Sequence, residues 1–122
     1  MIVLDTSVLI DSFSGPRTSE ARLRRLMSSD QILVPAIVLY EWLRGPRTPA
    51  ELNHQEAALP TAASIPFGHA EASIAAQIYR AVRSPRSREV DIAIAATAIR
   101  FDALLWTLNL RDFADIPGLR LL

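Results

Sequence analysis

The sequence of 122 residues contains neither cysteine nor lysine. Without cysteine, the chain cannot form disulfides, use thiol catalysis or build a thiolate metal site. Without lysine, it cannot carry a P-loop, which requires Gly-Lys-Ser or Gly-Lys-Thr, and it cannot be a phospho-aspartate receiver domain, which uses a lysine. All thirteen basic residues are therefore arginine.

Histidine is scarce as well. His54 and His69 are the only two, and they lie 15 positions apart in polar surroundings, which gives little support to a zinc site. Thirteen acidic residues balance the thirteen arginines, so the net charge argues neither for nor against a nucleic-acid partner. Any such argument depends on where the charges lie.

The chain has no uninterrupted apolar run of the roughly 18 residues that a membrane span needs. Pro35 and Glu41 interrupt the longest candidate, and Arg100 ends the next. We therefore expect no membrane contact. Asp5 stands where a secretory leader would carry positive charge, so we expect an intracellular protein located in the cytoplasm.

The chain begins with a short apolar strand, Ile2 to Leu4, that leads directly into a carboxylate, Asp5. A run of aliphatic residues is typical of a strand buried on both faces, as in parallel sheets covered by helices. Asp5 would then lie at the carboxyl end of a strand, where open α/β sheets bind ligands. The alternative is that Asp5 only caps the helix that follows.

Strands and helices alternate along the rest of the chain, which indicates an α/β fold. We expect a single domain over residues 1–122, built as a three-layer α/β/α sandwich around a mostly parallel sheet. The expected helices are 7–13, a segment from Thr18 or Ser19 to about residue 28, 36–43, 48–59, 69–82 and 89–101. The expected strands are 2–4, 31–34, 62–67, 103–107 and 119–122, with loops at 84–88 and 109–115.

Four of the thirteen acidic residues are embedded among apolar residues, where an unpaired charge costs several kcal/mol. Glu41 shares a helix face with Ile37 and Val38, and Asp91 lies in the first turn of the alanine-rich helix. The other two follow strands at the same edge of the sheet. The four are Asp5, Glu41, Asp91 and Asp112.

Each of these carboxylates, taken alone, could be explained by a buried ion pair with an arginine. Taken together they would need four such pairs, whereas one divalent cation accounts for all of them. Hard cations such as Mg²⁺ or Mn²⁺ are held by carboxylates and retained waters, and carboxylates brought together without a cation repel one another. The pattern favours a metal site.

The four stretches that carry these residues resemble the four motifs of PIN domains. More narrowly, they resemble the toxin ribonucleases of VapBC toxin-antitoxin pairs and their FitB-like relatives. The similarity runs along the whole chain, and four motifs in the right order are far more specific than any one of them. The stretches are Ile2 to Ile10, Pro35 to Glu41, Asp91 to Ala98 and Thr107 to Phe113.

The resemblance implies a metal-dependent endoribonuclease directed at single-stranded RNA. Its acidic site maps onto Asp5, Glu41, Asp91 and Asp112, with Asn109 as a possible further metal partner. It also implies a Mg²⁺ or Mn²⁺ cofactor, a homodimer, and a small VapB-type antitoxin that connects the complex to operator DNA. The last motif offers both Asn109 and Asp112, so the fourth ligand stays open between them.

Several neighbours of these carboxylates are candidate substrate contacts. Thr6 and Thr107 can hydrogen-bond either the metal ligands or a substrate phosphate. Arginines follow Glu41 and precede Asp91, and the planar guanidinium groups of Arg44 and Arg88 suit phosphate. Their alternative is a solvated face paired with acidic residues. Trp42 and Trp106 are either base-stacking residues or part of the core.

The same fold could serve as a catalytically weak binding module that acts through protein or DNA contacts. A haloacid-dehalogenase-like phosphatase with Asp5 as its nucleophile requires a second Asp two positions later, but Ser7 stands there. The sequence does not identify which RNA is cut, because that depends on loop shape and arginine placement.

Overall fold

The computed structural model describes residues 1–122 and contains one parallel sheet of four strands. The strand order is β2-β1-β3-β4, and each neighbouring pair runs parallel. The two central strands, β1 and β3, have three residues each, and the two outer strands have two. The bounds are β1 Ile2–Leu4, β2 Ile32–Leu33, β3 Leu104–Trp106 and β4 Arg120–Leu121.

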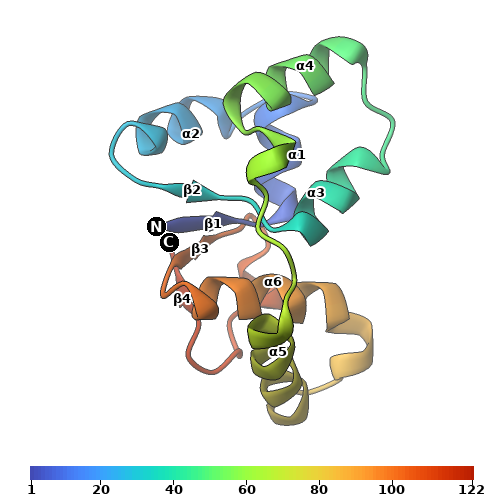
Figure 1. Ribbon diagram of the computed structural model, residues 1–122, viewed down its shortest axis with the longest axis vertical. Helices are drawn as coiled ribbons and strands as arrows, with labels where there is room; N and C mark the ends of the chain where they lie inside the picture. The colour runs from blue at the N-terminus through green and yellow to red at the C-terminus, as the bar shows by residue number, and fades with distance from the viewer.

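Helices cover the sheet in two layers (Figure 1). The helices α1, α2 and α4 lie on one side, α5 and α6 lie on the other, and α3 lies beside the end of β1 at which the chain enters α1 (Figure 1). This arrangement confirms the predicted α/β fold with a central parallel sheet. The bounds are α1 Thr6–Phe13, α2 Glu20–Met27, α3 Ala36–Leu43, α4 Pro49–Ala58, α5 His69–Ala81 and α6 Glu89–Arg100.

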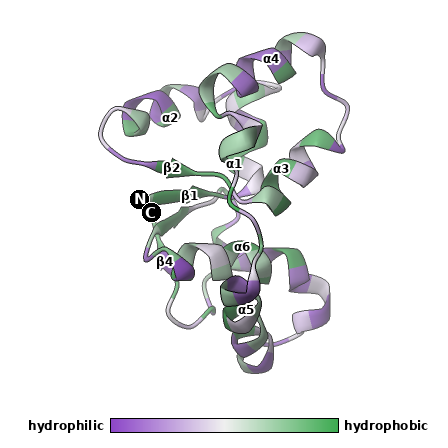
Figure 2. Ribbon diagram, viewed as in Figure 1, coloured by the Kyte–Doolittle hydropathy of each residue, from purple (hydrophilic) through white to green (hydrophobic).

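The core lies on both faces of β1, whose three residues are at most 2% exposed. Figure 2 shows the same segment as a hydrophobic strand between the two helical layers. Three alanines of α6, Ala95, Ala96 and Ala98, are fully buried. Small side chains allow this helix to approach the sheet closely, which brings the start of α6 near the strand ends. Trp42 and Trp106 are also buried, so the core interpretation of both tryptophans is confirmed.

The register of β1 and β3 sets the position of the candidate site. Leu4 pairs with Trp106, and the backbone N–H of Asp5 donates to the Trp106 carbonyl at 2.9 Å. Because parallel strands end at the same edge of a sheet, Asp5 and Thr107 emerge side by side. They are 102 positions apart in the sequence.

The predicted strand over residues 62–67 is wrong. Residues Thr61–Ala63 form a short 3₁₀ turn, and only Ile65 joins the sheet, through an isolated parallel bridge to Pro35. Proline residues on both sides, Pro60 and Pro66, lack the N–H groups that a longer ladder would need. The segment is therefore a connection and not a fifth strand.

The two predicted loops also contain short 3₁₀ turns, η2 at Pro85–Arg88 and η3 at Leu110–Asp112. Both lie beside acidic candidates. The first leads directly into α6, and the second carries Asp112 past the end of β3. Such turns have no hydrophobic periodicity of their own, so the sequence gives no sign of them.

Buried polar contacts fix the α3–α4 hairpin. The indole N–H of Trp42 donates to Gln55 Oε1 at 3.1 Å, and Gln55 Nε2 donates to the Leu59 carbonyl at 2.9 Å. The Arg47 guanidinium lies 4.2 Å from the Trp42 ring centroid. Because Trp42 follows Glu41, these contacts restrict the rotation of the helix that carries this acidic residue.

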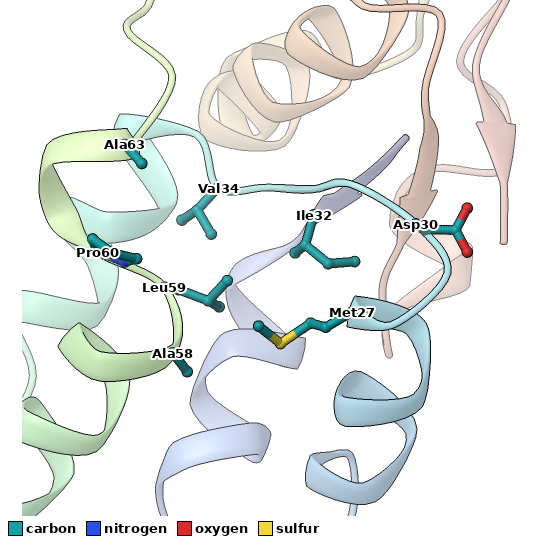
Figure 3. Close-up of a pocket in the computed structure, with 8 residues that line it drawn as sticks. All are labelled: Met27, Asp30, Ile32, Val34, Ala58, Leu59, Pro60 and Ala63. Carbon is teal, nitrogen blue, oxygen red and sulfur yellow. The ribbon is translucent and has the colours of Figure 1, made fainter.

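An apolar cavity of about 210 Å³ lies between α2, β2 and the end of α4 (Figure 3). Met27, Ile32 and Leu59 point into it, and none of the four acidic candidates lines it. None of the helices combines the length and the hydrophobicity needed to span a membrane.

Ser12 Oγ is the only fully buried side-chain polar atom without a hydrogen-bond partner. We expect Ser12→Ala to leave the free energy of unfolding unchanged or to raise it by about 1 kcal/mol, because a desolvated, unpaired hydroxyl is removed. Ser19 is the matched control, since its buried hydroxyl donates to Asp11 at 2.7 Å. Ser19→Ala should lower the free energy of unfolding by about 1 kcal/mol.

Urea denaturation of both variants measures the difference. An equal loss in Ser12→Ala and Ser19→Ala would contradict the prediction, because it would mean that the Ser12 hydroxyl has a partner.

Candidate active site

Asp5 is the most buried of the four acidic candidates, with 4% of its surface exposed. Its Oδ2 atom accepts hydrogen bonds from Ser7 Oγ and Thr107 Oγ1, each at 2.7 Å. No donor contacts the other carboxylate oxygen, Oδ1. Two neutral hydroxyls therefore fix the orientation of the carboxylate without cancelling its charge.

The same two hydroxyls connect the turns that follow β1 and β3. Ser7 Oγ accepts the backbone N–H of Leu108 at 3.0 Å, and Thr107 Oγ1 accepts that of Asn109 at 2.9 Å. Each hydroxyl thus donates to Asp5 and accepts from the neighbouring turn. Thr107 is fully engaged by protein groups, so the structure supports its contact with a metal-ligand candidate and gives no support to a phosphate contact.

Sequence reasoning did not assign Ser7 to the site. The signal was available, because Ser7 stands two residues after Asp5 in the first turn of the expected helix, where hydroxyl side chains hydrogen-bond nearby groups. What the sequence could not show is that the same hydroxyl also binds the turn after β3.

Glu41 lies on α3 with 16% of its side chain exposed. Its Oε1 accepts a 2.5 Å hydrogen bond from Thr6 Oγ1, and its Oε2 pairs with Arg44 at 3.2 Å. The Arg44 guanidinium also lies 5.4 Å from the ring centroid of Tyr40. Thr6 is therefore engaged by a carboxylate, as Thr107 is, while Arg44 remains more than half exposed on the solvent side.

Asp91 lies in the first turn of α6 and is half-buried. Burial is the largest cause that raises the pKa of Asp91, and the nearby charges of Asp5, Asp112 and Glu41 act in the same direction, while Arg88 opposes them. Together these effects raise the pKa to about 6. The structure therefore brings the four predicted carboxylates into one electrostatic neighbourhood. Like charges that act on a single group favour either a proton or a cation there.

The two candidates for the fourth position, Asp112 and Asn109, are both exposed. The charge of Asp112 acts on Asp91. The side chain of Asn109 makes no hydrogen bond, while its backbone N–H donates to Thr107 Oγ1 and its carbonyl accepts from the Asp112 N–H. The charge effect favours Asp112, and the choice between them stays a prediction.

Arg88 differs from its expected role as a phosphate contact. Its guanidinium forms a bidentate pair with Asp115, at 2.6 and 2.9 Å, and also donates to the Asp112 carbonyl at 2.8 Å. Only 16% of the side chain is exposed. The structure engages this arginine with protein partners and gives no support to a substrate contact.

The acidic side chains fit a hard divalent cation by chemistry, because they offer only carboxylate oxygens and their mutual repulsion needs positive charge. No three acidic or histidine side chains lie close enough in the structure to coordinate one ion together. Thr6 and Arg44 each bind one carboxylate oxygen of Glu41. A shared ion would therefore require these side chains to change their positions.

None of the four carboxylates lines an enclosed pocket. Together they form a rim that runs from the buried Asp5, at the carboxyl end of β1, to the exposed Asp112. Small-molecule sites are usually concave clefts that bury most of their ligand. An open acidic rim is better suited to a chain that passes across the surface.

Comparisons with known proteins identify relatives along the whole chain. The family described as "PIN domain" matches residues 2–119. Ribonuclease VapC19 from Mycobacterium tuberculosis is 32% identical over 123 aligned positions, which cover 98% of each chain.

Solved structures have the same fold. A toxin-antitoxin complex from Klebsiella pneumoniae contains a chain that is 29% identical, with a TM-score of 0.67 and coverage of 98% of this chain and 95% of that one. DNA-bound VapBC from Salmonella typhimurium contains a chain that is 24% identical, with a TM-score of 0.75 and coverage of 99% and 96%.

We predict that Asp91 makes stability depend on pH. In the unfolded chain this carboxyl ionises near its ordinary pKa of 3.8, but in the fold it holds its proton up to a pKa of about 6. The folded state therefore binds the extra proton between these values, and stability falls as the pH rises through this window. Asp91→Asn removes this loss, so its melting temperature relative to the parent should rise between pH 4.5 and pH 7.5.

Thermal melts in EDTA measure this difference. Asp30→Asn changes an exposed carboxylate away from the site and should show a difference that does not vary with pH. If the Asp91→Asn difference were equally constant, the four carboxylates would not share one electrostatic environment.

Proposed function

The chain belongs to the PIN-domain family, and on this basis we propose that it is a divalent-metal-dependent endoribonuclease that acts as the toxin of a type II toxin-antitoxin pair. The observation that carries the proposal is the grouping of four carboxylates around Asp91, whose pKa is raised to about 6 by burial and by the charges of Asp5, Asp112 and Glu41 together. Full-length similarity to a protein named as a VapC ribonuclease supports the reaction class.

We assign Asp5 and Asp91 as the principal ligands of Mg²⁺ or Mn²⁺. Glu41 is a further ligand or orients the attacking water, and Asp112 completes the outer part of the site, with Asn109 as the alternative. A bound divalent cation supplies Lewis acidity and lowers the pKa of a coordinated water. Phosphodiester hydrolysis needs both, together with compensation for charge that develops on the phosphate.

The chain's own residues orient these groups. Ser7 and Thr107 hold one oxygen of Asp5 and leave the other free, while Thr6 holds one oxygen of Glu41. Hydrogen-bonding partners of this kind typically change metal affinity or activity by about 10 to 100-fold when they are removed. We therefore place Thr6 and Thr107 as positioning residues and not as phosphate contacts.

Arg44 is the candidate contact for the RNA backbone. Its guanidinium is exposed, lies beside Glu41 and contacts the ring of Tyr40, which is itself 54% exposed. A cation is needed near an acidic site that accepts a polyanion. The open rim is consistent with single-stranded RNA, whose backbone can follow a surface without entering a pocket.

The partners that we propose are a small VapB-type antitoxin and, through it, operator DNA. The support comes from the solved relatives, which are toxin-antitoxin complexes, one of them DNA-bound.

The nuclease proposal predicts that Asp5→Asn or Asp91→Asn lowers RNA cleavage by about 100-fold or more while the fold persists, because each removes a principal metal ligand. Cleavage of a labelled single-stranded RNA in Mg²⁺ or Mn²⁺ measures the loss, and circular dichroism checks the fold. Asp30→Asn, which changes an exposed carboxylate outside the site, should cleave normally. Full activity of either site variant, or undiminished cleavage in EDTA, would refute the proposal.

We also propose a homodimer. An apolar groove of about 550 Å³ lies between α3, α5 and α6 and includes Phe67, which is 47% exposed. Contiguous exposed apolar surface is characteristic of an interaction site, and symmetric pairs are the commonest oligomers.

Ala76 lines this groove and is exposed. If two copies meet there, Ala76→Arg should convert a dimer into a monomer, as measured by light scattering, because it buries an unpaired charge in an apolar contact. Ala21→Arg, at an exposed alanine of α2, should leave the mass unchanged. A dimer that persists in Ala76→Arg would place the interface elsewhere.

A further inference from the structure

Arg88 occupies a central position between two segments of the site. It is the last residue of η2 and stands directly before α6, three positions ahead of Asp91. Its Nη1 donates to the Arg83 carbonyl at 3.1 Å and to Asp115 Oδ2 at 2.9 Å, and its Nη2 donates to Asp115 Oδ1 at 2.6 Å and to the Asp112 carbonyl at 2.8 Å. A guanidinium has five N–H donors, so only the Nε–H remains free.

The ion pair between Arg88 and Asp115 constrains geometry more than it stabilises the fold. Asp115 is about half exposed, so solvent screens the pair and limits its contribution to stability. The geometry, however, is bidentate, which fixes the relative orientation of the two groups. The hydrogen bonds from Arg88 also lower the pKa of Asp115. The pair therefore has more value as a geometric constraint than as a source of stability.

Arg88 also supplies the only hydrogen bonds between the segment 83–91 and the segment 107–116. The first segment carries Asp91 and the second carries Asp112. Asp112 is exposed and lies in a short 3₁₀ turn that has few hydrogen bonds of its own. Without the contacts of Arg88, no hydrogen bond would join the two segments, and the distance between these two carboxylates would depend on the packing of Phe113 and Ile116 and on bonds within the second segment.

We propose that Arg88 is a positioning residue of the nuclease site: acting with Asp115, it holds the backbone of Asp112 at a fixed place relative to Asp91, so that both carboxylates can serve the same divalent cation. This inference rests on the proposed function. It replaces the expected phosphate contact, because the donors that would bind phosphate already bind protein oxygens.

The test measures metal affinity separately from catalysis. Calorimetric titration with Mn²⁺ should show an affinity about 10 to 100-fold lower in Arg88→Gln than in the parent protein. Arg88→Lys should behave like Arg88→Gln, because lysine keeps the charge but cannot form the bidentate pair and reach the Asp112 carbonyl as well. At saturating Mn²⁺ the KM for RNA should be unchanged in both variants.

Three further variants complete the test. Asp115→Asn should lower Mn²⁺ affinity in the same direction, and the double variant should lose no more than Arg88→Gln alone, because the two residues act as one unit. Arg86→Gln removes a neighbouring exposed arginine that makes no hydrogen bond or ion pair, and it should bind Mn²⁺ like the parent. If Arg88→Gln fails to fold, the Mn²⁺ affinity of Asp115→Asn still tests the positioning role.

The outcomes separate the two proposals. If the parent protein binds no Mn²⁺ and cleaves no RNA, the nuclease function itself fails. If the parent binds Mn²⁺ and Arg88→Gln and Asp115→Asn bind it equally well, only the positioning role fails. A raised KM with unchanged Mn²⁺ affinity in Arg88→Gln would restore Arg88 as a phosphate contact, and an equal loss in Arg86→Gln would attribute the effect to net charge.

Discussion

The parallel pairing of β1 with β3 is the constraint on which the site depends. It joins the first residues of the chain to residues more than a hundred positions later, and it places Asp5 beside Thr107 at one edge of the sheet. A shift of β1 by one residue against β3 would turn Asp5 toward the opposite face of the sheet and away from Thr107. The fully buried sequence of β1 opposes such a shift, because its side chains fit the core on both faces.

The fold brings acidic groups together at this edge, and the surrounding residues reduce the free-energy cost of their mutual repulsion. Asp5 is held by hydroxyls, Glu41 by a hydroxyl and an exposed guanidinium, and Asp91 shifts its pKa to about 6. None of these contacts, nor the shifted pKa, removes the local excess of negative charge. This arrangement lowers stability at the place where we propose that a cation binds, as is common at functional sites.

Much of this could be predicted from the sequence, because the informative signals are local. Ile2 to Leu4 followed by Asp5 indicates a buried strand with a carboxylate at its end, and the apolar neighbours of Glu41 and Asp91 mark them as unusual acidic residues. The failures have two origins. The strand expected at 62–67 overlooks a local signal, because Pro60 and Pro66 lack backbone donors, whereas the role of Arg88 depends on Asp115, 27 positions away.

The hydrogen-bond donors around the site differ in charge, and this difference decides how much negative charge each carboxylate keeps. A guanidinium directly on Asp5 would orient it as well as Ser7 and Thr107 do, but it would also neutralise the charge that a metal ion needs. Arg44 instead contacts one oxygen of Glu41, and Arg88 binds Asp115, a carboxylate outside the predicted ligand set. Asp5, the most buried carboxylate, is therefore ordered by neutral donors alone and keeps its full charge.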